Sequence, residues 1–333
     1  MNRFLLRDEV VNVGLYVPLG MAAYLALRRN FWLPALIGFV LSVCMEMAQL
    51  FVPGRDTSAV DVVTNVAGTI AGVGFGVIFD RLAIRSRSKL RAATSADSRP
   101  ALLLLFLWAG FLLFPFFPVL GFYVPRQRVS VFLHSAPFAL VPLISGVVTW
   151  LAAGRLMEAA RIRAPHRLLA WSLLAIPAQF FIVDRRPVSA DLVGAAAGLC
   201  IFVFARGKGR TWIAVAFLAA ILVRGVAPLH FVSQSSGFSW VPFGGFLGTE
   251  WQSGLGVFLE KSFYYGTAIW LLQKCPMRLV NAAAIVAGVL TAIEIAQIHL
   301  PGRTAEITDP LLAILLAVML SAMARKKRSG VAG

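Results

Sequence analysis

Long apolar stretches follow one another along almost the whole chain. Each is close to the ~20 residues that an α-helix needs to cross the hydrocarbon core of a membrane. Hydrophobic residues make up 59% of the 333 residues and charged residues only 14%, whereas soluble domains carry about 25% charged residues. This composition excludes an ordinary soluble enzyme, a disordered protein and a nucleic-acid-binding domain, although the net charge is +16. It predicts an all-α polytopic membrane protein.

About eleven of these stretches are long enough to be transmembrane helices. Counts of ten or twelve spans stay open, because the fourth or the eighth stretch can be misread. The expected spans are residues 10–27, 31–51, 59–79, 101–121, 131–153, 167–183, 189–205, 211–229, 255–272, 279–299 and 307–324.

Basic residues indicate the orientation of these spans. If the C-terminus is cytoplasmic, the inner segments hold 21 of the 31 Lys and Arg residues and only three acidic residues, Asp80, Asp97 and Glu158. The positive-inside rule favours this orientation, and an odd number of spans then places the N-terminus outside. The basic segment 81–100 either serves only as a topology determinant or also touches anionic lipid headgroups.

A polar motif, E-x-x-Q-x-x-x-P-G-R-x-x-x-x-x-D, occurs twice in the chain. A third copy is degraded: it keeps the six-residue intervals from Gln179 to Arg185 and from Arg185 to Asp191, but Ile176 replaces the glutamate. Such internal similarity predicts a repeated structural unit. The two complete copies pair Glu46 with Glu294, Gln49 with Gln297, Pro53 with Pro301, Gly54 with Gly302, Arg55 with Arg303 and Asp61 with Asp309.

The repeat extends upstream, where Asn12 in the first copy corresponds to Glu260 in the last, and where His134 is expected to hold this position in the middle copy. Each unit then has three helices, and single helices link the units. Three helices plus one linker is an even number, so the three repeats are parallel and pack around a pseudo-threefold axis. The expected segments are 1–80 (first repeat), 81–125 (basic linker and helix), 126–205 (degenerate second repeat), 206–257 (linker helix and long outer loop) and 258–333 (third repeat and basic tail).

Within each copy, polar residues gather at the outer end of a helical hairpin. Glu46 and Gln49 share one helix face, and the Pro-Gly pair ends that helix. Asp61 follows near the start of the next helix, where a carboxylate is favoured. Asn65 lies one turn further, and small residues such as Gly68 let another helix approach.

A charged residue inside a span costs about 2.5–3.5 kcal/mol on insertion scales, so it needs a partner or a function. Two interpretations are open. In the structural one, the carboxylates hold the arginine of the turn and thereby fix the hairpin. In the functional one, the arginine binds phosphate or carboxylate in a pocket open to the outer leaflet, and the carboxylates act as acid, base or acceptor.

The candidate ligand-binding residues follow from this motif, while no catalytic residue can be assigned. Asn12 and Glu260 form a second polar row, for which hydrogen bonding between helices is the simpler explanation. The scattered histidines and cysteines predict neither a metal site nor a cofactor. The candidates are Glu46, Gln49, Arg55, Asp61 and Asn65 in the first copy, Gln179, Arg185 and Asp191 in the middle copy, Glu294, Gln297, Arg303 and Asp309 in the last copy, and Asn12 and Glu260.

At these residues the sequence resembles the VanZ-like family of bacterial integral membrane proteins. The match lies in Asn12 with Pro18-Leu19-Gly20, in Glu46-x-x-Gln49 with Pro53-Gly54-Arg55, and in Asp61-x-x-x-Asn65-x-x-Gly68. It covers residues 10–80 well, 258–320 fairly well and 131–205 weakly. The resemblance implies a multi-pass protein of the bacterial cytoplasmic (inner) membrane, linked to resistance to the glycopeptide teicoplanin. The last copy departs from the family pattern, since Ala313 and Leu316 replace Asn65 and Gly68.

The expected partners are membrane lipids, including lipid-linked cell-wall precursors, and not nucleic acid. The first hypothesis is therefore a protein that binds or handles an anionic lipid or lipid-linked glycan at the outer leaflet. The alternatives are an intramembrane lipid hydrolase or transferase that uses Glu46 and Asp61, and a small-solute transporter. The aromatic outer loop 230–256 is expected to be a lid over this site or an interfacial anchor.

Overall fold

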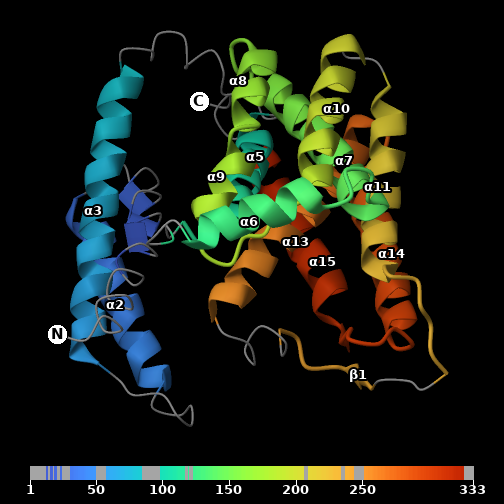
Figure 1. Cartoon of the computed structure of the whole chain (residues 1–333). Coiled ribbons are helices and arrows are strands. Elements are labelled where there is room, and N and C mark those ends of the chain that lie inside the picture. The colour runs from blue at the N-terminus through green and yellow to red at the C-terminus, as the bar shows by residue number, and fades with distance from the viewer. Residues whose placement is uncertain are drawn as a thin grey trace, which may run out of the picture. The chain divides into compact units, whose positions relative to one another are not determined.

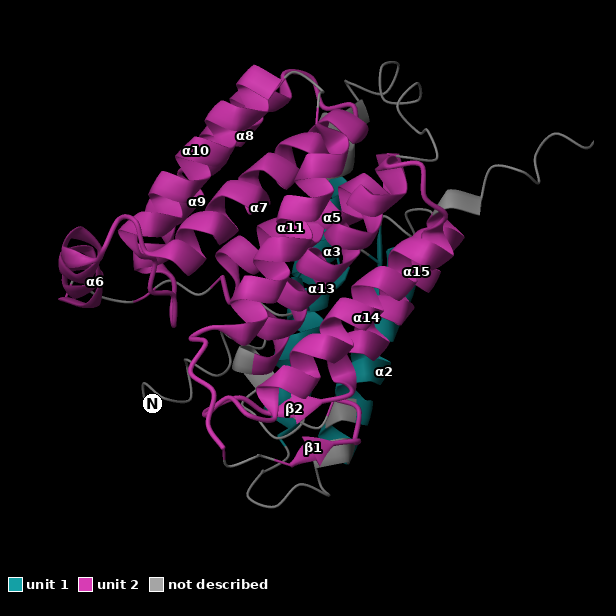
Figure 2. Ribbon diagram, turned by 90° about the vertical axis from the view of Figure 1, so that its right-hand side faces the viewer, with its two compact units in different colours: residues 1–92 teal, residues 93–333 magenta. Residues whose placement is uncertain are grey.

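The computed structural model describes residues 31–49, 58–84, 98–116, 123–205, 209–233, 237–243 and 251–325, and positions 13, 16–17, 19–20, 23–24 and 119. The chain divides into two compact units, Met1–Ala92 (unit 1) and Ala93–Gly333 (unit 2), which Figure 2 distinguishes by colour. Apart from one pair of two-residue strands, the regular structure of the described residues is helical. The prediction of an all-α chain is therefore confirmed.

Unit 1 contains α2 (Trp32–Gln49) and α3 (Ala59–Ile84), which pack along each other (Figure 1). The Asn65 side chain on α3 donates a hydrogen bond of 2.9 Å to the Ser42 hydroxyl on α2, and both residues are buried. A Cβ atom added at Gly68 would collide with the carbonyl oxygen of Val13. The prediction that Gly68 permits a close helix approach is therefore confirmed.

Unit 2 is a helical bundle with one short parallel strand pair, β1 (Phe238–Ser239) with β2 (Ala305–Glu306). Its helices are α5 (Ser98–Leu113), α6 (Tyr123–His134), α7 (Leu140–Ala159), α8 (Pro165–Ser172), α9 (Ala175–Ala178), the 3-10 helix η2 (Gln179–Phe181), α10 (Ser189–Ala205), α11 (Arg210–Val226), α13 (Trp251–Lys274), α14 (Leu279–Gln297) and α15 (Thr308–Arg325).

Helix α13 lies at the centre of unit 2, where it packs against α5, α11, α14 and α15. Its residues Phe263 and Ile269 are fully buried, together with Leu104 of α5 and Phe217 of α11. Because α13 is covered on several sides, charged residues in its N-terminal half meet other helices. Glu260 pairs with Arg224 of α11, and Lys261 pairs with Asp309 of α15.

Glycines allow α7 and α10 to pack with their backbones in close contact. A Cβ atom added at Gly198 of α10 would lie 2.5 Å from the carbonyl oxygen of Val147 and 3.0 Å from the Cβ of Trp150. Backbone atoms cannot yield as a flexible side chain can. Any side chain at position 198 would therefore push the two helices apart.

We expect Gly198→Ala to lower the free energy of unfolding by about 1–2 kcal/mol, because overpacking displaces the backbone. Gly288→Ala in α14 is the matched control, since a Cβ atom there meets nothing within 4 Å. The control should be neutral or stabilise the helix, as alanine replaces a flexible glycine. Thermal unfolding of both purified variants in detergent checks this, and equal melting temperatures would contradict it.

Two of the expected spans are interrupted. The span 131–153 combines the end of α6 with the first part of α7, and Pro137 lies in the break between them. The span 167–183 is divided into α8, α9 and η2. Pro177, within α9, lacks the N–H group that would bond to the carbonyl of Leu173, and the helix is interrupted at Leu173 and Leu174. The prediction of one helix over 167–183 is wrong.

Within the described residues, α7 and α14 are the helices long and apolar enough to cross a membrane. Shorter apolar stretches lie at Trp32–Cys44, Ala59–Gly74, Ser98–Leu113, Ser189–Ala205 and Thr308–Met323. Large apolar side chains are also widely exposed, among them Phe204 (82%), Trp212 (78%) and Val280 (75%). The count of eleven spans stays a prediction.

Candidate functional site

A polar cavity of about 690 Å³ lies in unit 2, and we call it the central cavity. Its charged lining residues are Asp191, Arg224, Glu260, Lys261, Arg303 and Asp309. A smaller cavity of about 260 Å³, the side cavity, shares Ser145, Asp191, Arg224, Glu260 and Tyr264 with it and adds Gln179, Asp184, Arg185 and Arg186. The structure thus gathers the predicted polar residues of the middle copy, and those of the last copy except Glu294, around two adjoining cavities.

Arg224, in the last turn of α11, stands in the wall shared by the two cavities. Its guanidinium forms an ion pair with Glu260 and donates a hydrogen bond of 3.2 Å to the Tyr264 hydroxyl. The same guanidinium lies over the Tyr264 ring, 5.0 Å from its centroid. The Tyr264 hydroxyl is also 3.0 Å from the hydroxyl of Thr149 on α7. Glu260 therefore takes part in interhelical bonding that ties α7, α11 and α13 together.

Asp309, at the start of α15, is buried and held by two residues of α13. The ammonium of Lys261 lies 2.6 Å from Oδ1, and the Tyr265 hydroxyl donates a hydrogen bond of 2.5 Å to Oδ2. Lys261 and Tyr265 are four residues apart, so they share one face of α13. The carboxylate also complements the positive N-terminal end of α15. This interaction fixes the start of α15 against the centre of unit 2.

The two motif glutamates make the same hydrogen bond. Glu46 accepts the backbone N–H of Ser58 through Oε2 at 3.0 Å. Glu294 accepts the backbone N–H of Glu306 through Oε2 at 2.8 Å. In both cases the donor lies 12 residues after the glutamate, just ahead of the next helix.

The middle copy satisfies the corresponding N–H group in a different way. In this copy Ile176 replaces the glutamate, and the N–H of Val188 bonds instead to Oδ2 of Asp191 at 2.9 Å. In all three copies the donor is the residue three positions before the motif aspartate. A carboxylate therefore accepts this N–H group in each copy.

Arg303 is not held by the motif carboxylates. Its guanidinium is exposed and donates one hydrogen bond of 3.1 Å to the carbonyl of Ala227, after α11. Gln297 anchors the same segment, because its side-chain amide donates a hydrogen bond of 2.8 Å to the carbonyl of Gly225. The structural interpretation, in which the carboxylates hold the turn arginine, is wrong for this copy. Glu294 and Asp309 fix the hairpin through a backbone N–H group and α13, which leaves the arginine free of them.

Arg185 of the middle copy has a different role. Its Nε donates a hydrogen bond of 2.8 Å to the carbonyl of Phe114. A second guanidinium nitrogen donates a hydrogen bond to the carbonyl of Phe111. Phe111 lies in the last turn of α5, and Phe114 follows the helix. Carbonyl groups at the end of a helix lack partners within it. Burial lowers the pKa of Arg185, but an arginine stays charged at any physiological pH. Gln179 lines the side cavity.

Several predicted residues of the first copy lie outside the described part of the chain: Asn12, Arg55 and the side chain of Gln49. Asp61 is in the first turn of α3, and its backbone N–H donates a hydrogen bond of 3.1 Å to the carbonyl of Ser58. In the middle copy, the assignment of His134 to the position of Asn12 is wrong. His134 is exposed at the end of α6, whereas α7 is the helix that precedes α8.

No group of three or more His, Cys, Asp or Glu side chains in the described residues is arranged to hold a metal ion. Comparison with known proteins gives one positive result: the family model described as VanZ/LLP1 matches residues 2–80. This segment is VanZ-like. The match covers the segment predicted from the sequence to be the first repeat, and it includes α2 and α3. No curated protein and no solved structure matches the chain.

Three lining residues outside the VanZ-like segment were missed in the sequence. Arg224, Lys261 and Tyr265 carry much of the polar bonding in unit 2, yet none belongs to the repeated motif. Arg224 interrupts the apolar stretch 211–229, and a charged residue inside such a stretch is a functional-site signal in its own right. That signal would have found Arg224. The same signal would have found Lys261, which lies in the expected span 255–272, whereas Tyr265 carries no charge and gave no such signal.

Proposed function

We propose that this VanZ-like protein is a multi-pass protein of the bacterial cytoplasmic membrane, with its N-terminus outside and its C-terminus in the cytoplasm. It binds the phosphate-bearing headgroup of an anionic lipid or lipid-linked glycan in the central cavity. Arg303 carries this proposal. A lipid-linked cell-wall precursor is the ligand class that connects the cavity with the glycopeptide resistance implied by the resemblance.

Arg303 has unused hydrogen-bonding capacity at the edge of the cavity. A guanidinium has five N–H donors in a fork that matches phosphate and carboxylate. Among the described residues, the one hydrogen-bond partner of Arg303 is the carbonyl of Ala227. The carboxylates around it are engaged: Glu294 by a backbone N–H group, and Asp309 by Lys261 and Tyr265. The cavity volume of about 690 Å³ lies within the usual range of ligand sites.

The exposed apolar surface supports a membrane location. Side chains such as Phe204, Trp212 and Val280 are more than two-thirds exposed on helices. Exposed apolar surface on this scale is typical of membrane or protein contacts. In the proposed orientation, the segments after α11 and after α14 face outward, and Arg303 lies at the level of the outer leaflet. A ligand would then enter the central cavity from that leaflet.

The shared hydrogen bonds support the proposed division into three parallel repeats and two linker helices. The N–H groups of Ser58, Val188 and Glu306 occupy one position of the repeat frame, and each bonds to a carboxylate. Helices α5 and α11 then act as the linkers. In this arrangement the last copy supplies the turn arginine of the central cavity, and the middle copy supplies Asp191.

We expect Arg303→Ala to reduce binding of the co-purified anionic lipid by about tenfold or more, because a charge-assisted hydrogen bond contributes ~1.5–3 kcal/mol. The measurement is native mass spectrometry of the full-length protein with its bound lipids, alongside a thermal melt. Arg303→Lys should retain part of the binding, since it keeps the charge but loses the fork geometry.

The matched control is Arg126→Ala, which removes an exposed cation of α6 that does not line the central cavity. It should leave the lipid profile unchanged. The proposal fails if Arg303→Ala melts normally and keeps the same lipid species at the same occupancy. A lowered melting temperature with an unchanged lipid profile would assign Arg303 a purely structural role.

A further inference from the structure

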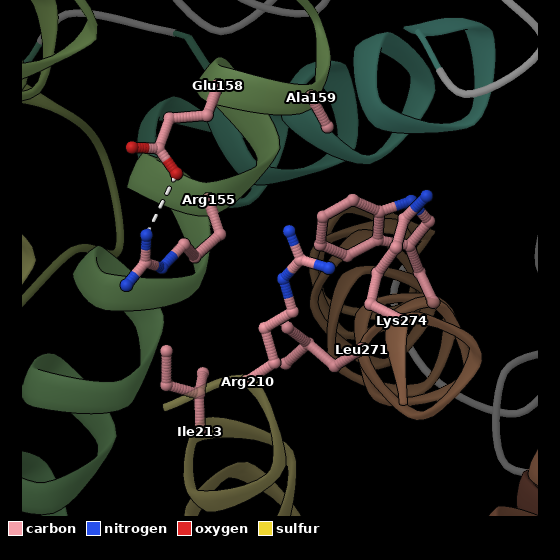
Figure 3. A pocket seen from close by; sticks show the side chains of 8 residues that line it. Arg155, Glu158, Ala159, Arg210, Ile213, Leu271 and Lys274 are labelled. Atoms are coloured by element: carbon pink, nitrogen blue, oxygen red, sulfur yellow. Dashed lines mark hydrogen bonds and ion pairs between the residues drawn. The ribbon is translucent and has the colours of Figure 1, made fainter. Parts of the chain in front are cut away.

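Unit 2 contains another cavity, of about 320 Å³, at the opposite ends of the same helices. We call it the basic cavity, and Figure 3 shows it lined by Arg155, Glu158, Ala159, Arg210, Ile213, Trp270, Leu271 and Lys274. Arg210 begins α11, whereas Arg224 of the central cavity lies in its last turn. Fourteen residues of α-helix span about 21 Å. The two cavities are therefore separate sites at opposite ends of α11.

Positive charge dominates the basic cavity. Three cations, Arg155, Arg210 and Lys274, come from three different helices and face it together with one carboxylate, Glu158 (Figure 3). Arg155 bonds to Glu158 at 2.9 Å, although its side chain is only 8% exposed. The exposed Arg210 has no hydrogen-bond or ion-pair partner among the described residues. The cations of this cavity are therefore only partly neutralised.

The wall of the basic cavity also contains a buried donor. Trp270 is 4% exposed, and its indole Nε1 has no hydrogen-bond partner among the described residues. The arginine and lysine side chains that line the cavity can only donate hydrogen bonds. The ligand that suits these cations is an acceptor with several oxygens and negative charge.

We propose that the basic cavity binds a phosphate group, carried by an anionic phospholipid headgroup or by free phosphate. Arginine forks and lysine ammonium groups are the usual phosphate ligands in proteins. Basic pockets between transmembrane helices on the cytoplasmic side are suited to anionic headgroups. The site uses none of the residues of the central cavity, so it stands independently of the ligand proposed there.

The positive-inside rule for membrane orientation explains only part of this cluster of basic residues. A positive-inside signal requires basic residues in the loops, with their charges in water. It requires neither a buried guanidinium at position 155 nor a buried indole N–H group at position 270. Arg167, in the first turn of α8, is a basic residue of that kind, since it is exposed and does not line the cavity.

The test is a titration of the full chain in detergent with short-chain phosphatidylglycerol, and with phosphatidylcholine as the reference lipid. Native mass spectrometry counts the bound lipid. All variants are made in the Arg303→Ala background as well, so that binding at the central cavity is separated from binding here. A second arm adds inorganic phosphate as a competitor.

We expect Arg210→Ala/Lys274→Ala to weaken phosphatidylglycerol binding roughly 20-fold, because each cation near a membrane surface contributes appreciably to headgroup affinity. Trp270→Phe keeps every charge but removes the N–H group together with part of the indole ring beneath Lys274, so it should weaken binding by no more than about fivefold. Arg167→Ala is the matched control and should bind as the parent does. Displacement by inorganic phosphate would assign the site to free phosphate, and resistance to it would assign the site to the lipid headgroup.

The proposal is overturned if the double variant binds phosphatidylglycerol as tightly as the parent, or if Arg167→Ala weakens binding equally. Equal binding of phosphatidylcholine and phosphatidylglycerol would also overturn it. If the double variant does not fold, the single variant Arg210→Ala decides, because Arg210 is exposed and lines the cavity: unchanged affinity for both phosphatidylglycerol and phosphate rejects the site.

Discussion

Replacing Lys261 by methionine should lower the free energy of unfolding by about 3 kcal/mol. The ammonium of Lys261 lies 2.6 Å from Asp309, whose side chain is only 7% exposed. Removing one partner of a buried ion pair leaves the other charge uncompensated, which costs roughly 3–5 kcal/mol in buried sites. We take the lower end because the lysine side chain is 26% exposed and water screens part of the effect. Denaturant titration in detergent micelles measures the change.

A double-mutant cycle separates this interaction from the loss of packing. Asp309→Asn keeps the shape of the side chain and removes its charge, so Lys261→Met/Asp309→Asn should be more stable than Lys261→Met alone. Lys274→Met is the control on the same helix, because Lys274 lies in the last turn of α13, far from Asp309, and its ammonium is 5.3 Å from the centroid of the Trp270 ring. If Lys261→Met unfolds no more easily than Lys274→Met, the buried pair does not stabilise unit 2.

The polar motif could be found from sequence, but its bonding could not. Spacing alone placed Glu294, Gln297 and Asp309 at one end of a hairpin, and they do lie there. The partners of Asp309 come from α13, 44 and 48 residues earlier in the chain. Which faces of two helices meet depends on packing, and a single sequence does not encode that packing in any short-range pattern. The interpretation in which the motif carboxylates hold Arg303, one of the two left open by the sequence, is wrong for this reason.

Helix ends show the same limit. Apolar length predicted a helix through 167–183, while Pro177 and the turn after Ser172 divide this stretch into short pieces. Hydropathy averages over a window and does not register one missing N–H group. Conversely, α13 begins at Trp251, earlier than the apolar stretch from residue 255 indicates. The prediction of a long aromatic loop over 230–256 is thereby shortened, since Trp251 belongs to the helix.

A second large effect is expected from removing the motif glutamates. Glu294 is 2% exposed and accepts the N–H of Glu306 at 2.8 Å. Glu294→Ala should cost about 3 kcal/mol, since it leaves a buried N–H group without an acceptor and opens a cavity. Glu294→Gln keeps an acceptor oxygen at the same place and should recover most of the loss. Denaturant titration measures stability, and hydrogen–deuterium exchange of the segment around Glu306 reports the bond itself.

The same substitutions test whether the three repeats are equivalent. Glu46→Ala should release the Ser58 amide to exchange as Glu294→Ala releases Glu306, because both glutamates bond the same position of the repeat. In the middle copy, Asp191→Ala should release Val188, whereas Ile176→Ala should not, since the acceptor there is the aspartate. This pattern follows from one N–H position being satisfied by a carboxylate in every copy. Fast exchange at Val188 in Ile176→Ala, or unchanged exchange at Ser58 in Glu46→Ala, would show that the likeness of the copies is local and not a shared repeat.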